Sequence, residues 1–293
     1  MSLAAVHARA VKALKRNEMD LLARLLADNP SLAHVPSEEG SYLIDRCACP
    51  SSTDPSHGGY AQALAMLLEA GADPDRPVVA GGQQTLRMAA SVGHGAAVRL
   101  LIDWGARIDG DPNDLRSPLG EAIYWQQRAI VVQLLEAGAS MAKLYVAAGV
   151  GQRAAVEAHF DASGALRAQA VGSAPDGGTG DAPPSDRQAI LNEAWIYAVH
   201  GGHADTADYL LDRGAQIDAI EPTAWMPMRV SALHFAALRG DRSAIDYLLL
   251  RGADAALRDQ QYSATPDSWA EYNGYPELAD LIRAHARAKA DST

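Results

Sequence analysis

The sequence predicts an all-α solenoid built from about seven to eight stacked helix pairs. A Gly-Ala dipeptide follows a leucine-rich stretch five times, with its glycines at positions 71, 105, 138, 214 and 252. The steps between these glycines are 34, 33, 76 and 38 residues, and the longest step is expected to contain one degenerate copy. A Leu-x-x-Ala pattern, with Trp195 in place of the leucine in one copy, begins nineteen residues before four of the glycines. Two patterns at a fixed offset indicate a repeat architecture.

Each copy predicts a first helix, a short turn at glycine, a second helix, and a glycine that ends this second helix in the left-handed conformation. One such pair cannot bury its own apolar face, so it must stack on its neighbours. The many alanines fit this arrangement, because methyl side chains let neighbouring helices approach closely.

The most regular copy runs from Ser231 to Ala255 and reads SALHFAALRGDRSAIDYLLLRGADA. It resembles the ankyrin repeat, whose pattern is T-P-L-H-x-A-A followed by G-H and L-L-x-x-G-A-D. The resemblance implies a binding scaffold that recognises a protein or peptide partner through a groove and finger loops. Histidines at the pattern's own positions, His94, His203 and His234, are interpreted as structural.

We expect a single solenoid domain over residues 1–288 and a short tail over 289–293, with insertions at 49–60, 162–188 and 220–231. Long loops in compact folds are usually binding elements or linkers. The Gly-, Pro- and Asp-rich loop 162–188 is typical of a mobile tether, and a lid is the alternative. The third insertion either presents its side chains to a partner or folds back over the apolar seam beneath it.

The composition excludes several function classes. The formal net charge is -11 and the isoelectric point is about 5.2, so nucleic acid and anionic membranes are not expected as ligands. Cys47 and Cys49 are too close in sequence to pair, which favours a reducing, cytoplasmic environment. No cofactor motif is present, and the Cys-Ala-Cys spacing is not the spacing usual for zinc. We therefore expect no cofactor and no metal.

The candidate partner-binding residues follow Leu-x-x-Ala-Ala in the first helices or lie in the third insertion. With only 6% aromatic residues in the chain, aromatic side chains at such positions favour binding. The set is Tyr124, Trp125, His200, Trp225, Met226, Met228, Arg239 and Tyr272. The acidic net charge favours a basic partner by steering, although Arg229 and Arg239 lie in the proposed site itself.

An alternative function is a small-molecule pocket or an enzyme built on the irregular fifth and sixth copies. Glu193, Tyr197 and His200 recur at i, i+4 and i+7, which places a carboxylate, a phenol and an imidazole on one helix face. Such a set can transfer protons if water is excluded. In the competing interpretation, Glu193 is exposed and Tyr197 packs against the seventh copy. We favour a protein without catalytic activity, and the sequence names no reaction.

Overall fold

The computed structural model describes residues 2–38, 40–49, 57–76, 84–111, 116–170, 187–220 and 230–290. Within these ranges every regular element is a helix, and two isolated antiparallel bridges join described residues, Phe160 with Leu166 and Ile220 with Ser231. The prediction of an all-α fold is confirmed. The chain divides into two compact units, Met1–Ser140 and Met141–Thr293.

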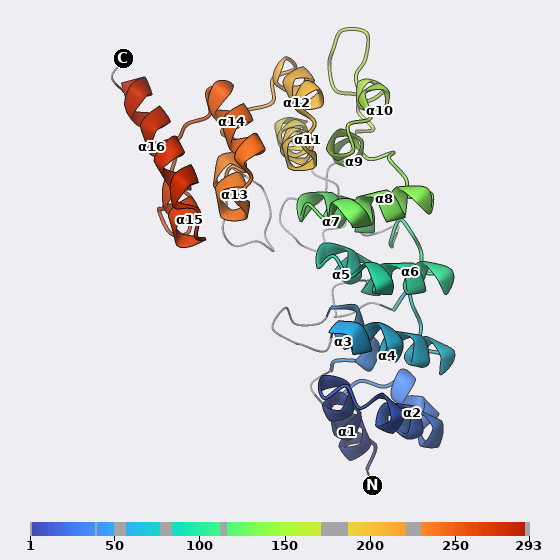
Figure 1. Cartoon of the computed structure of the whole chain (residues 1–293). Helices are drawn as coiled ribbons and strands as arrows, with labels where there is room; N and C mark the ends of the chain where they lie inside the picture. The colour runs from blue at the N-terminus through green and yellow to red at the C-terminus, as the bar shows by residue number, and fades with distance from the viewer. Residues whose placement is uncertain are drawn as a thin grey trace. The chain divides into compact units, whose positions relative to one another are not determined.

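The first unit consists of four helix pairs, in which the two helices of each pair pack against one another. The helices α5 and α7 also contact each other, as do α6 and α8, so the pairs stack in register (Figure 1). A 3₁₀ turn, η1, follows the first pair. The elements are α1 (Leu3–Lys15), α2 (Met19–Asp28), η1 (Pro30–Ala33), α3 (Leu43–Ala48), α4 (His57–Glu69), α5 (Thr85–Ser91), α6 (Gly95–Asp103), α7 (Pro118–Tyr124) and α8 (Arg128–Glu136).

The second unit also consists of four pairs, and its first helices contact in the order α9, α11, α13 and α15. The degenerate copy predicted between glycines 138 and 214 forms the short helices α9 and α10. The helices are α9 (Leu144–Gly149), α10 (Arg153–Glu157), α11 (Arg187–Gly201), α12 (Ala204–Leu211), α13 (Ala232–Arg239), α14 (Arg242–Leu250), α15 (Pro266–Tyr272) and α16 (Pro276–Ala290). Because α16 extends to Ala290, the last helix includes the first two residues of the predicted tail.

The alanine pairs of the repeated pattern are buried, and the first helices that carry them contact one another. Ala89 and Ala90 in α5, and Ala147 and Ala148 in α9, have no solvent exposure. Larger side chains fill the space between these close contacts, and the largest fully buried ones are Trp195, Tyr124, Tyr145 and Phe235. The alanine content therefore follows from the stacking of the pairs.

One hydrogen bond recurs between consecutive pairs, and we call it the register hydrogen bond. The acceptor is the carboxylate of an aspartate that lies four residues after the glycine of one Gly-Ala motif. The donor is the backbone amide that lies two residues after the glycine of the next Gly-Ala motif. Asp75 accepts from the Arg107 amide at 2.8 Å, and Asp109 accepts from the Ser140 amide at 2.7 Å. In the second unit Asp218 accepts from the Asp254 amide at 2.8 Å.

In the sixth copy the amide two residues after the glycine is bonded within its own helix pair. Position 142, after the glycine at 138, is an alanine without a side-chain acceptor, and the fifth copy, α9 and α10, lies between it and α11. Here α11 begins at Arg187, before the repeated Leu-x-x-Ala pattern, and its Asn192 Oδ1 accepts from the Gln216 amide at 2.8 Å. Gln188 adds a bond from its Nε2 to the Gly214 carbonyl at 2.8 Å. The early start of α11 therefore supplies an acceptor for the amide that follows its own partner helix, α12.

The turn glycine of a pair packs against a side chain of the next pair. Gly240 has a φ of 66°, and a Cβ atom at this position would lie 2.5 Å from the Tyr275 ring. The same arrangement joins Gly151 to His203, where a Cβ atom would lie 2.4 Å from the imidazole. His203 is thus a packing residue, as predicted. His234 is also structural, because its ring nitrogens bond Ser231 Oγ at 2.8 Å and the Ala264 carbonyl at 3.1 Å.

The three predicted insertions are described in part. Residues 50–56, 171–186 and 221–229 lie outside the described ranges. At the start of the second insertion the chain turns, and Asp161 Oδ1 accepts from the Ser163 and Ala165 amides. At the third insertion, the bridge between Ile220 and Ser231 brings the two ends of the loop together.

The register hydrogen bond predicts the cost of losing its acceptor. Replacement Asp218→Ala is expected to lower the free energy of unfolding by about 1 kcal/mol. Asp218→Asn is expected to cost less, because Asn192 makes the same bond with an amide oxygen. Urea unfolding measures both values. The exposed Asp212→Ala is the control, and an equal loss in Asp212→Ala and Asp218→Ala would contradict the role assigned to this bond.

The packing of the turn glycines predicts two different costs for the same substitution. Gly252→Ala should cost about 1 kcal/mol, because its φ is 92° but no atom lies within 4 Å of the added Cβ. Gly240→Ala adds a collision with the Tyr275 ring and should cost at least about 1 kcal/mol more. Thermal unfolding compares the two, and equal melting temperatures would show that Tyr275 does not constrain this turn.

Candidate functional site

The helix-end positions are the two residues that follow Leu-x-x-Ala-Ala in each first helix. In the first unit they include Tyr124, the last residue of α7, and Trp125, which caps it. Tyr124 is 1% exposed, and its ring meets the half-buried Trp125 edge-on with 5.1 Å between centroids. Tyr124 is therefore a core residue, contrary to the expectation that it faces a partner, whereas Trp125 keeps part of its surface.

In the second unit the helix-end positions separate into one buried and two exposed side chains. His200 in α11 is only 5% exposed, since its ring stacks on Phe235 of the next pair with 4.3 Å between centroids. Arg239, the last residue of α13, is exposed. Tyr272, the last residue of α15, is 90% exposed. The expectation that His200 faces a partner is thus wrong, whereas Arg239 and Tyr272 are exposed.

The three α11 residues considered for proton transfer are all buried. Glu193, Tyr197 and His200 are each 5% exposed, so the interpretation that leaves Glu193 in solvent is wrong. The Tyr197 ring packs edge-on against Tyr145 of α9, with 4.7 Å between centroids. These contacts give Tyr197 and His200 a packing role between neighbouring pairs.

Burial, with a further contribution from the Arg239 charge, lowers the pKa of His200 to about 3. The imidazole is therefore neutral at neutral pH and binds protons weakly. A general acid or base works best when its pKa is near the working pH. The environment of His200 opposes the catalytic role considered for it.

A finger segment between α14 and α15 is held by one buried carboxylate. Asp259 is 2% exposed and accepts from the amides of Gln261, Tyr262 and Ala264 at 2.5 to 3.0 Å, and from Trp269 Nε1 at 2.9 Å. Burial alone would raise the pKa of Asp259, but these hydrogen bonds outweigh it and lower the pKa.

The finger presents Tyr262, whose ring is 63% exposed and lies 6.0 Å from that of Trp269. The sequence interpretation missed this residue, because it considered helix-end positions and the loop inserted at 220–231 alone. The sequence does contain a signal for it, since Tyr262 is an aromatic residue in the segment between Gly252-Ala253 and Thr265-Pro266.

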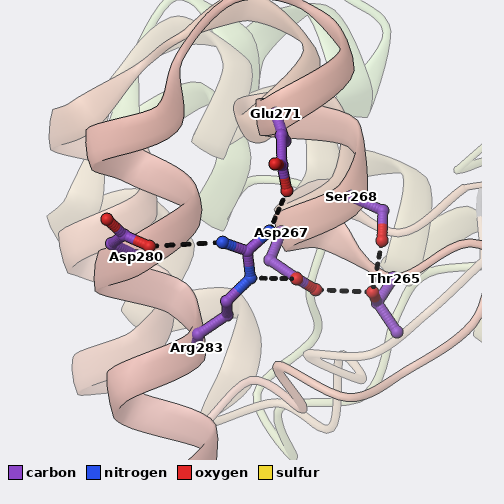
Figure 2. A network of polar contacts seen from close by, with 6 residues as sticks. All are labelled: Thr265, Asp267, Ser268, Glu271, Asp280 and Arg283. Carbon is purple, nitrogen blue, oxygen red and sulfur yellow. Dashed lines mark hydrogen bonds and ion pairs between the residues drawn. The ribbon is translucent and has the colours of Figure 1, made fainter.

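A second polar network joins α15 to α16 (Figure 2). The Arg283 guanidinium donates to Asp267 at 2.8 Å, to Asp280 at 3.2 Å and to Glu271. Thr265 Oγ1 also donates to Asp267. Burial opposes ionisation of Asp267, but the bonds from Thr265 and Arg283 outweigh it and lower its pKa. Carboxylates of α15 are thus directed toward α16.

Other kinds of site were sought in the described part of the chain. No group of three or more His, Cys, Asp or Glu side chains there is placed to hold a metal ion. Among the same residues, no helix is both long enough and apolar enough to cross a membrane. The side chains of Trp225, Met226 and Met228 lie outside the described ranges.

Paired helices, register hydrogen bonds and turn glycines at a recurring spacing define a stacked helical-repeat protein. Residues 196–249 match the family model described as ankyrin repeats in many copies, so the chain carries ankyrin repeats. Repeats of this family generally serve as scaffolds for protein interaction. One solved structure found by comparison is the human ASB11 ankyrin repeat domain, 21% identical, with 83% of this chain and 97% of that chain covered and a TM-score of 0.34. No curated protein matches the chain.

The buried imidazole of His200 predicts a pH dependence of stability. Its pKa is about 3 when folded and near 6.5 when exposed, so the unfolded chain binds the proton more tightly. The stability from neutral His200 is fully present above pH 6.5 and is lost as the pH falls toward 3. Between pH 7 and pH 5 this loss is about 2 kcal/mol.

The variant His200→Leu should lack this part of the pH dependence, so its stability relative to wild type should rise as the pH falls from 7 to 5. Urea unfolding at several pH values measures the difference, in which contributions from the other histidines cancel. Parallel curves for the two proteins would contradict the assignment.

Proposed function

We propose that this protein binds a protein or peptide partner through exposed side chains at the ends of the first helices of the second unit. The observation that carries the proposal is Tyr272, which leaves 90% of its side chain in solvent at the end of α15. Tyrosine and arginine are enriched among residues that dominate binding energies, and the exposed Arg239 is the last residue of the neighbouring α13.

Further contacts are proposed on the same reasoning. Trp225, Met226 and Met228 belong to the loop whose ends meet at the bridge between Ile220 and Ser231, next to the start of α13. Trp125 offers a half-buried indole in the first unit. Tyr124 and His200 are left out of the proposed contact surface because both side chains are buried.

The small-molecule alternative has weaker support. Its three candidate groups, Glu193, Tyr197 and His200, lie on α11, and two of them are engaged in ring packing with Tyr145 and Phe235. The pKa of about 3 leaves His200 poorly suited to proton transfer near neutral pH. Partner binding is therefore the function that we put forward.

Photo-crosslinking tests the proposal directly. The photoreactive residue benzoylphenylalanine is placed at position 272 of the full chain, which is then irradiated in extract from the source cells. We expect a discrete crosslinked product whose yield falls at least tenfold when Arg239→Ala is added. Mass spectrometry of the product identifies the contacting partner segment.

The matched control places the same photoreactive residue at position 250. Leu250 is 79% exposed but lies at the end of α14, a second helix, so position 250 should give no such product. Identical products from both positions, or a yield at position 272 that is insensitive to Arg239→Ala, would rule out this surface. Circular dichroism confirms that each variant is folded.

A further inference from the structure

From residue 5 onward, the exposed positions of α1 are alanines and basic residues alone. The helix contacts α2 and α4, and its apolar side is buried at Val6, Ala10 and Leu14. At about 3.6 residues per turn, the exposed positions lie within about a third of the helix circumference and so form one face. We call this set the α1 face, which comprises Ala5, Ala8, Arg9, Lys12, Lys15 and the cap residue Arg16.

The α1 face is basic in a chain that is acidic overall. The chain up to Arg16 contains four of the 25 Lys and Arg residues and none of the 36 Asp and Glu residues. Within the described part of the chain, the ammonium groups of Lys12 and Lys15 form no ion pair. Arg16 pairs with Glu18 at 3.9 Å, but both side chains are exposed, and such pairs are weak. The helix dipole favours the two lysines in the last turn, but it does not explain Arg9 in the middle of the helix.

In two other pairs the first helix is covered along its whole length. Both α7 and α9 are buried at every residue, whereas α1 leaves its basic side in solvent. On this side Ala5 and Ala8 leave room for another helix to approach closely, as the buried alanines do between stacked pairs. The α1 face therefore combines the small side chains that close helix packing requires with a row of positive charges.

We propose that the α1 face binds an acidic helix of a partner protein, which lies along α1 and pairs its Asp or Glu side chains with Lys12 and Lys15. Arg9, Lys12 and Arg16 recur at i, i+3 and i+7, so carboxylates at the same spacing on a facing helix can meet them. The charge of this helix is opposite to the one that the net charge of the whole chain favours in a partner. The α1 face belongs to the first unit, so this proposal is independent of the surface proposed above for the second unit.

A membrane surface suits the α1 face less well than a helix does. Helices that bind membranes peripherally insert an apolar side, but the apolar side of α1 is buried in the fold. The remaining attraction would come from charge alone, which acts over about 8 Å at physiological ionic strength. A membrane would also meet the acidic residues, all of which lie beyond Arg16 in the sequence. A partner helix needs to cover the α1 face only.

The test compares two selections of random peptides displayed on phage, one on the full wild-type chain and one on the double variant Lys12→Glu and Lys15→Glu. We expect the peptides enriched on wild type alone to carry Asp or Glu at helical spacing. Synthetic copies, followed by fluorescence anisotropy, should bind the double variant at least tenfold more weakly, because the reversed charges repel them. A proline in the middle of a copy should abolish its binding, because proline breaks a helix.

The matched control is the double variant Arg99→Glu and Arg128→Glu, which changes the charge by the same amount at exposed positions of α6 and α8. This variant should bind the copies as wild type does, and so should Tyr272→Ala in the second unit. Urea unfolding shows whether each variant is folded, and Lys12→Gln with Lys15→Gln replaces the charge reversal if that variant is not.

Three results would overturn the proposal. The first is a selection that gives the same peptides on wild type and on the Lys12 and Lys15 variant. The second is a set of wild-type peptides without acidic residues. The third is binding of wild type to phosphatidylserine vesicles that the same variant loses while no peptide distinguishes the two proteins, since this result would assign the α1 face to a membrane.

Discussion

The register hydrogen bond is the interaction on which the stacking of the helix pairs depends. A single pair has an apolar face and no core, so its structure requires a neighbour at a defined offset. Apolar contact between alanines and leucines is not directional, whereas one carboxylate facing one backbone amide fixes the offset. The aspartates at positions 75, 109 and 218 make this bond to the amide that follows the next second helix. The sixth copy differs, because Asn192 of the early-starting α11 bonds the Gln216 amide within its own pair.

Each helix pair could be predicted because its signals are local. Leucine spacing, the alanine pair and the terminal glycine lie within one repeat, and even the degenerate fifth copy forms α9 and α10. Exposure of single side chains was not predictable in the same way. Tyr124 and His200 occupy positions that count as surface in the pattern, yet His200 is covered by Phe235, 35 residues further along the chain. Burial is set by such contacts between copies, and the pattern within one copy does not contain them.

In the candidate site, too, the residues placed by the repeat pattern could be predicted, and those that depend on contacts outside the pattern could not. Arg239 and Tyr272 were identified from their places in the repeat, and the structure leaves both exposed. Tyr262 was missed because its presentation depends on Asp259, which holds the finger through amides on one side and the Trp269 indole on the other. The sequence also does not show which way the carboxylates of α15 point. Net charge counts Asp267 and Glu271 like any others, but Arg283 turns both toward α16.

The finger held by Asp259 has a consequence for the thermodynamics of recognition. A loop that orders only on contact with its ligand loses conformational entropy at that moment, and this loss weakens the complex. The amides of Gln261, Tyr262 and Ala264 are already fixed on one carboxylate in the unbound chain. The ordering cost has therefore been met during folding. Any partner that contacts Tyr262 meets a prearranged surface, and more of the contact energy is retained as affinity.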